Sequence, residues 1–164
     1  PHLEDTDLQH AVAATVAYFE KRLPHLGSRV DLRCESDLGN RCRYNRDLME
    51  WVLENLIKNG IDALPEQGGS IRVTLDDGPR DSVQIRVSDT GGGIPSAHRN
   101  RIFEAGYTTK RRGWGMGLAL VKRIVVQYHG GRIQVERTGS AGTTFLITLP
   151  GEGKDFAVQD PVGG

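Results

Sequence analysis

The sequence has no excess of either charge, because 21 lysines and arginines balance 21 aspartates and glutamates. Proteins that bind nucleic acid or anionic membranes through charge carry a positive excess, so we expect neither partner for this chain. Cysteines are scarce too, with Cys34 and Cys42 alone and no Cys/His cluster at zinc spacing. The two thiols can pair in principle, but without a secretion signal we expect them to be reduced, in a cytoplasmic protein.

Long apolar runs are also missing. No stretch reaches the length of a transmembrane helix, and no secretion signal opens the chain. The 37% of hydrophobic residues suffice for one core. We therefore expect one domain over residues 1–150 and a flexible tail or linker remnant over residues 151–164. Because the chain starts at Pro1, we expect it to be part of a longer protein.

Residues 51–64, WVLENLIKNGIDAL, are the most clearly helical stretch, and Asn45 is a plausible N-cap before them. Their apolar residues share one arc, and Asn55, Asn59 and Asp62 follow i, i+4, i+7 spacing along its edge. Polar side chains beside a buried face need partners. This edge therefore either binds something polar or is hydrated by solvent.

Apolar periodicity predicts two further helices, at 8–23 and 115–129, and strands at 29–34, 70–75, 82–88, 132–137 and 143–149. Helices on one side of a sheet form a two-layer sandwich. We expect an α+β fold with a mixed, mostly antiparallel sheet and three main helices on one face. The long glycine-rich connection over 89–114 is typical of a functional loop or of disorder.

Two glycine-rich boxes follow the central helix, DTGGGI at 89–94 after a strand and GWGMGLAL at 113–120 before a helix. The asparagine helix and these boxes, in this order, resemble the Bergerat-type ATP-binding domain of the histidine kinase, gyrase, Hsp90 and MutL superfamily. Over residues 5–150 the chain looks most like the catalytic domain of a sensor histidine kinase of the nitrogen-regulation type. A dinucleotide-binding fold is disfavoured, because no βαβ unit surrounds the glycines. The HRD and DFG boxes of protein kinases are absent.

The resemblance implies that the chain binds ATP and Mg²⁺. Asn59 matches the magnesium ligand, in agreement with the preference of Mg²⁺ for oxygen ligands, and Asn55 matches a residue that faces the phosphates. Asp89 matches the carboxylate that accepts a hydrogen bond from the adenine amine, although Asp before glycines is also an ordinary turn. Thr143 resembles a threonine that joins the adenine contact. Residues 94–114 would form a lid over the nucleotide. The other implied nucleotide contacts are Asp62, Gly91, Gly93, Ile94, Phe103, Thr108, Thr109, Lys110, Gly113, Gly115, Met116, Gly117 and Leu118, with Lys110 on the phosphates.

Position 55 separates kinases from hydrolases in this superfamily. The gyrase and MutL branches carry a glutamate there that activates water, whereas Glu54 of this chain points about 100° away around the helix. The resemblance therefore implies phosphoryl transfer to a histidine on a separate dimerisation domain, with a response regulator downstream. The alternatives are a protein-serine kinase of the same superfamily, a clamp ATPase, and a degenerate domain that binds nucleotide as a signal.

The family's phosphoacceptor histidine is followed directly by Glu or Asp. None of the five histidines of this chain has an acidic residue after it. We therefore expect the acceptor to lie outside this sequence, before Pro1.

Overall fold

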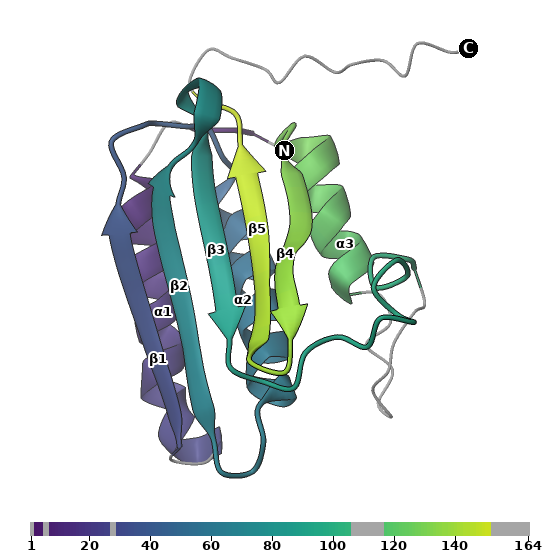
Figure 1. The fold of residues 1–164 in the computed structure, drawn as a ribbon. Helices are drawn as coiled ribbons and strands as arrows, with labels where there is room; N and C mark the ends of the chain where they lie inside the picture. Colours follow the sequence, from purple (N-terminus) through teal and green to yellow (C-terminus); the bar gives the residue numbers. More distant parts are fainter. Residues whose placement is uncertain (1, 5–6, 27–28, 106–116, 152–164) are drawn as a thin grey trace, which may run out of the picture.

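The computed structural model describes residues 2–4, 7–26, 29–105 and 117–151. The elements run in the order α1 (Leu8–Leu26), β1 (Val30–Asp37), α2 (Arg46–Ala63), β2 (Gly69–Asp77), β3 (Val83–Asp89), α3 (Gly117–Arg123), β4 (Arg132–Gly139) and β5 (Gly142–Leu149). A helical turn, Pro79–Asp81, joins β2 to β3, and a π-helical segment, Ile124–Tyr128, continues α3. The strands form one sheet in the order β1-β2-β3-β5-β4, in which β1 and β2 are parallel and all other neighbours antiparallel (Figure 1).

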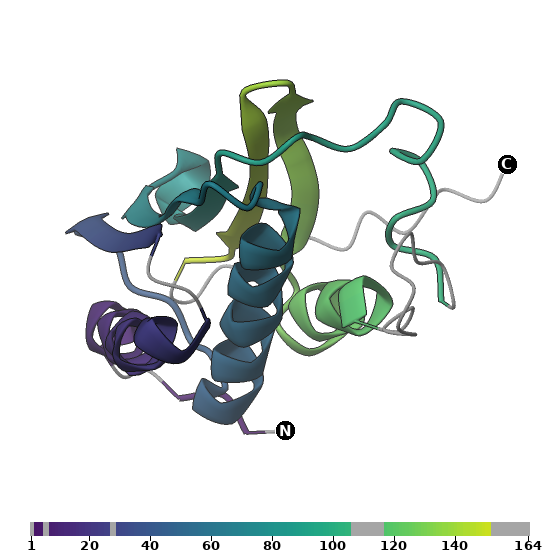
Figure 2. The same ribbon diagram turned by 90° about the horizontal axis from the view of Figure 1, so that it is seen from below.

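The three helices cover one face of this sheet, and α2 lies between α1 and α3 (Figure 2). Alternating residues of the central strands, such as Val73 and Ile85, are fully buried against apolar residues of α2 such as Val52 and Leu56. Each such aliphatic side chain contributes about 1.5–3 kcal/mol when it is withdrawn from water. The predicted two-layer α+β sandwich is confirmed.

The ends of the central helix lie within one residue of those that its sequence predicts. Asn45 caps it, because the Asn45 side-chain oxygen accepts the N–H of Leu48 at 2.9 Å. The N–H of Asn45 in turn donates to Nε2 of the buried His129 at 3.0 Å, which ties the end of the π-helical segment to the start of α2. The helix ends at Ala63, one residue short of the expected boundary, because Leu64 precedes Pro65 and adopts an extended conformation.

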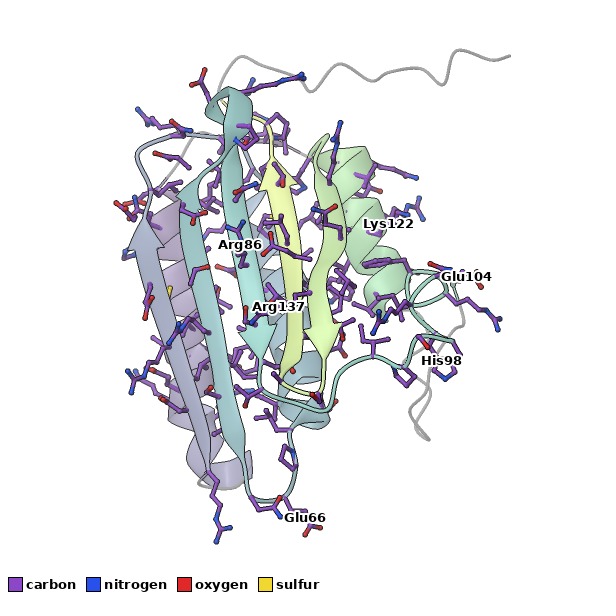
Figure 3. All side chains as sticks on the ribbon, in the orientation of Figure 1. Glu66, Arg86, His98, Glu104, Lys122 and Arg137 are labelled. Atoms are coloured by element: carbon purple, nitrogen blue, oxygen red, sulfur yellow. The ribbon has the colours of Figure 1, made fainter. Side chains whose placement is uncertain are left out.

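Strand β4 departs from the predicted regular strand, because it contains a β-bulge. Val135 pairs with Phe145 but Arg137 pairs with Thr144, so Glu136 is an extra residue on this strand. Arg86 of β3 donates to both carboxylate oxygens of Glu136, at 2.8 and 3.1 Å. Arg86 lies, together with Arg137, on the sheet face that carries no helix (Figure 3). The bulge is thus braced by an ion pair that crosses β5.

Two further expectations concern the thiols and the membrane. Cys34 and Cys42 are both free, Cys42 in the core and Cys34 partly exposed. In the part of the chain that the structure describes, no helix has the length and hydropathy needed to span a bilayer.

Candidate functional site

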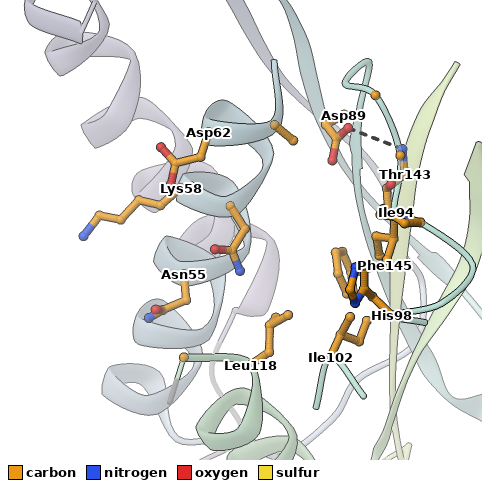
Figure 4. A pocket seen from close by; sticks show the side chains of 16 residues that line it. Asn55, Lys58, Asp62, Asp89, Ile94, His98, Ile102, Leu118, Thr143 and Phe145 are labelled. Atoms are coloured by element: carbon orange, nitrogen blue, oxygen red, sulfur yellow. Dashed lines mark hydrogen bonds between the residues drawn. The ribbon is translucent and has the colours of Figure 1, made fainter. Parts of the chain in front are cut away.

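A cavity of about 470 Å³ opens between α2 and the loop that follows β3 (Figure 4). This volume is typical of small-molecule sites. Helix α2 forms one wall, and the other walls come from the loop, the start of α3 and strand β5. The lining residues are Asn55, Lys58, Asn59, Asp62, Ala63, Asp89, Gly92, Gly93, Ile94, Pro95, His98, Ile102, Gly117, Leu118, Thr143 and Phe145.

The cavity collects predicted site residues from four separate segments of the chain. Those that line it are Asn55, Asn59, Asp62, Asp89, Gly93, Ile94, Gly117, Leu118 and Thr143. Gly91 and Phe103 do not line it. Thr108, Thr109, Lys110, Gly113, Gly115 and Met116 lie outside the described residues, as does the first half of the second glycine box.

The α2 wall presents several side-chain oxygen atoms that can serve as metal ligands. The amide nitrogen of Asn55 donates to the carbonyl of Trp51 at 2.8 Å, which leaves the amide oxygen of Asn55 facing the start of α3. Asn59 and Asp62 follow on the same ridge of the helix. Amide and carboxylate oxygens fit Mg²⁺, an ion that keeps several waters and also takes oxygens from bound phosphates. Among the described residues no cluster of three or more His, Cys, Asp or Glu could hold a metal.

Asp89 ends β3 and stands half-buried in the opposite wall. Its Oδ1 accepts the N–H of Gly91 at 2.8 Å and the N–H of Thr143 at 3.3 Å. Burial raises the pKa of Asp89, and these two backbone donors oppose that rise. Both bonds fall on Oδ1, which leaves the acceptor capacity of Oδ2 for a ligand.

Two glycines of the first box allow the loop to pack against its neighbours. A Cβ at Gly91 would lie 2.5 Å from the carbonyl oxygen of Ala63, at the end of α2. Gly93 has a φ of 83°, and a Cβ there would lie 2.3 Å from the carbonyl oxygen of Gly139. The loop therefore packs closely between α2 and the β4–β5 hairpin. This packing sets the distance between the two walls of the cavity at Asp89.

Apolar side chains make up the rest of the far wall. Ile94, Ile102, Leu118 and Phe145 form a surface suited to the face of an aromatic ring. Phe103 lies behind this wall, where its ring packs edge-to-face on Phe145 with centroids 6.3 Å apart. Phe103 thus supports a lining residue from outside the cavity.

Several lining residues were not predicted from the sequence, among them Lys58, His98, Ile102 and Phe145. Lys58 follows Asn55 by three residues on the same helix edge, so helical spacing could have identified it. Phe145 and Ile102 have the pattern of ordinary core residues. His98 lies in a loop with no periodicity, and no sequence signal points to it.

Comparisons with known proteins agree with this geometry. The family model described as "Histidine kinase-, DNA gyrase B-, and HSP90-like ATPase" matches residues 44–153. Sensor histidine kinase ZraS of Escherichia coli (strain K12) is 43% identical over 117 residues, which are 71% of this chain and 24% of ZraS. The chain spans between 14% and 28% of the length of three other curated relatives that it matches.

Solved structures resemble the chain along most of its length. The catalytic domain of histidine kinase ThkA has a TM-score of 0.80 and 28% identity, and the match covers 92% of this chain and 96% of that domain. Histidine kinase ThkA in complex with response regulator protein TrrA has a TM-score of 0.73 and 27% identity, and the match covers 90% of this chain and 41% of that kinase chain.

Proposed function

Because this chain belongs to the histidine kinase-, DNA gyrase B- and HSP90-like ATPase family, we propose that its cavity binds Mg·ATP and that the chain is the catalytic domain of a sensor histidine kinase. The family name implies ATP binding, and the match to 96% of the ThkA catalytic domain supports the extent of the unit. The nitrogen-regulation subtype stays a prediction from sequence.

One observation carries the proposal. On one side of the cavity a hydrogen-bond acceptor, Asp89, lies beside apolar side chains, and on the opposite side α2 presents oxygen atoms that can serve as metal ligands. Asp89 would accept a hydrogen bond from the adenine amine, and the apolar wall around Leu118 and Phe145 would hold the base. Asn59, with Asn55 beside it, would hold Mg²⁺, which neutralises phosphate charge when bound. The residues thus bind and orient a molecule that has a flat base at one end and an oxyanion at the other.

The same geometry favours transfer of the γ-phosphoryl group over its hydrolysis. Asn55 lines the cavity, and its amide cannot take a proton from water. Glu54 is not among the lining residues. Phosphoryl transfer depends mainly on positioning and on charge neutralisation, and these residues supply both. We propose that the acceptor histidine lies on a separate dimerisation domain, that a response regulator acts downstream, and that both steps take place in the cytoplasm. Histidine kinase ThkA has been solved in complex with response regulator protein TrrA, which supports this kind of partner.

A labelling experiment tests this proposal. With γ-labelled ATP and Mg²⁺, the chain alone should stay unlabelled, because none of its histidines has an acidic residue after it. Adding the histidine-containing dimerisation domain of its own protein should give acid-labile, base-stable label on that domain. The Asn59→Ala variant should lose this activity, whereas Glu54→Gln should keep it.

The possible outcomes separate the alternatives. Stoichiometric acid-labile label on the chain alone contradicts the assignment of the acceptor. Label that survives acid on the added domain points to a serine kinase. Release of inorganic phosphate that disappears in Glu54→Gln points to a clamp ATPase.

A further inference from the structure

Three hydrogen bonds connect the glycine loop, the β4–β5 hairpin and Asp89 at the edge of the cavity. The N–H of Ile94 donates to Oγ1 of Thr138 at 2.8 Å. Oγ1 of Thr138 lies 2.9 Å from Oγ1 of Thr143. The N–H of Thr143 donates to Oδ1 of Asp89 at 3.3 Å. Thr143 is 5% exposed and lines the cavity, whereas Thr138 stands behind it and does not.

The bulge in β4 is what brings the two threonines together. On β5, Thr143 shares a face with the buried Phe145 and Ile147, which is the face toward the helices. If Glu136 were paired in a regular antiparallel register, it would lie opposite Thr144, and Arg137 would lie opposite Thr143. With the bulge, Thr138 pairs with Thr143 and Arg137 turns to the helix-free face (Figure 3). A bulge that re-aims a side chain beside a binding site is a known functional use of this irregularity.

A hydroxyl group has one proton to donate and two lone pairs. Oγ1 of Thr138 accepts the N–H of Ile94, and Thr143 is the one acceptor for its proton that the described structure provides. If Thr138 donates to Thr143, the proton of Thr143 is directed to the cavity. With the opposite polarity, the proton of Thr138 has no acceptor within the described residues.

We propose that Thr138 is a positioning residue, which accepts from Ile94, donates to Thr143 and so holds the Thr143 hydroxyl as a donor toward the ligand. Hydrogen bonds in such a chain strengthen one another. Thr138 itself does not touch the ligand. Its effect reaches the cavity through the orientation of Thr143.

This polarity has a consequence for base selection, which rests on the proposed ATP binding. Asp89 is an acceptor and Thr143 a donor, side by side on the same wall. Adenine presents the complementary pair, with the donor amine N6 beside the acceptor N1. Guanine presents the reverse, with an acceptor O6 beside the donor N1–H. Thr138 therefore helps to reject guanine, although Asp89 makes the first contact.

The test combines variants at position 138 with nucleotides that lack single ring nitrogens. Dissociation constants for ATP, 1-deaza-ATP and 7-deaza-ATP are measured by calorimetry with Mg²⁺ on the whole chain. Loss of N1 should weaken binding to the wild type about three- to tenfold, the range of one neutral hydrogen bond. In Thr138→Val the ratio of the 1-deaza-ATP constant to the ATP constant should fall at least twofold. Thr138→Ser, which keeps the hydroxyl, should retain the wild-type ratio.

The controls separate orientation from general damage. The ratio for 7-deaza-ATP should be the same in all three proteins, because N7 lies on another edge of the base. Hydrogen exchange of the Ile94 amide should be faster in Thr138→Val and unchanged in Thr138→Ser. If the ratio of the 1-deaza-ATP constant to the ATP constant in Thr138→Val equals that of the wild type, this inference is overturned but the proposed function is not, since ATP would still bind. Absence of ATP binding to the wild type would overturn the proposed function and this inference with it.

Discussion

Replacement of Asp89 by Asn tests the central assumption about base recognition. The side chains have the same shape, and the amide oxygen of Asn can take the place of Oδ1 as acceptor for the N–H groups of Gly91 and Thr143. The amide nitrogen then replaces Oδ2 and presents a donor to the adenine amine. The local structure should survive, while one hydrogen bond to a charged group is lost.

The expected magnitude follows from that single bond. Hydrogen bonds to charged groups contribute about 1.5–3 kcal/mol, so the dissociation constant for ATP should rise about ten- to 150-fold. The nucleotide-free variant should be at least as stable as the wild type at neutral pH, because burial raises the pKa of Asp89 and its charged form therefore disfavours the folded state.

Calorimetric titration of ATP, together with thermal unfolding of the free proteins, measures both quantities. Asp31→Asn is the matched control, because Asp31 is exposed on the edge strand β1 and pairs with Arg33. Wild-type affinity should fall as the pH drops through the raised pKa of Asp89, and this dependence should be missing in Asp89→Asn. Unchanged affinity in a folded Asp89→Asn protein refutes the adenine assignment.

Three further variants test the packing and strand pairing that support the site. Burial lowers the pKa of His129, so at acidic pH the unfolded chain takes up a proton that the folded chain excludes. The free energy of unfolding should therefore fall as the pH drops below about 6.5. In urea titrations, the free energy of unfolding of His129→Gln should depend less on pH than that of the wild type. Gly91→Ala forces a methyl group against the backbone of Ala63, which should cost about 1–3 kcal/mol of stability by urea unfolding and weaken ATP binding; wild-type values for both would contradict the packing described. Deletion of Glu136 removes the extra residue but keeps Thr138 opposite Thr143, and it also removes the ion pair with Arg86. ATP affinity should therefore be retained while urea unfolding shows a lower stability, and loss of affinity in a folded deletion variant would contradict the register described.

Periodicity and end signals predicted much of the architecture. The apolar arc of α2, its cap at Asn45 and the alternation in β2 and β3 are properties of neighbouring residues, and each element formed near its expected bounds. The asparagine ridge on α2 was also visible, because helical spacing alone decides which side chains share an edge.

Features that depend on pairing between distant segments were not visible. The bulge at Glu136 exists because β4 has one residue more than the part of β5 with which it pairs, and nothing in the sequence of β4 by itself shows that difference. Thr138 therefore lay just outside the strand predicted at 132–137. Phe103 was expected at the nucleotide but lies behind Phe145. Its position could not be predicted, because an aromatic residue in an irregular loop has no periodicity that shows which side it faces.

The pairing of β3 with β5 determines when the cavity can exist. Asp89 and Thr143 meet although 54 residues separate them in the chain, and contacts between such distant segments require most of the fold to be in place. A partly folded chain that lacks the last hairpin has no base pocket. A nucleotide that binds here therefore selects the complete fold, and at a hundred times its dissociation constant it would stabilise the whole chain against unfolding by about 2.7 kcal/mol. The supply of ATP thus becomes a determinant of how long the domain resists proteolysis.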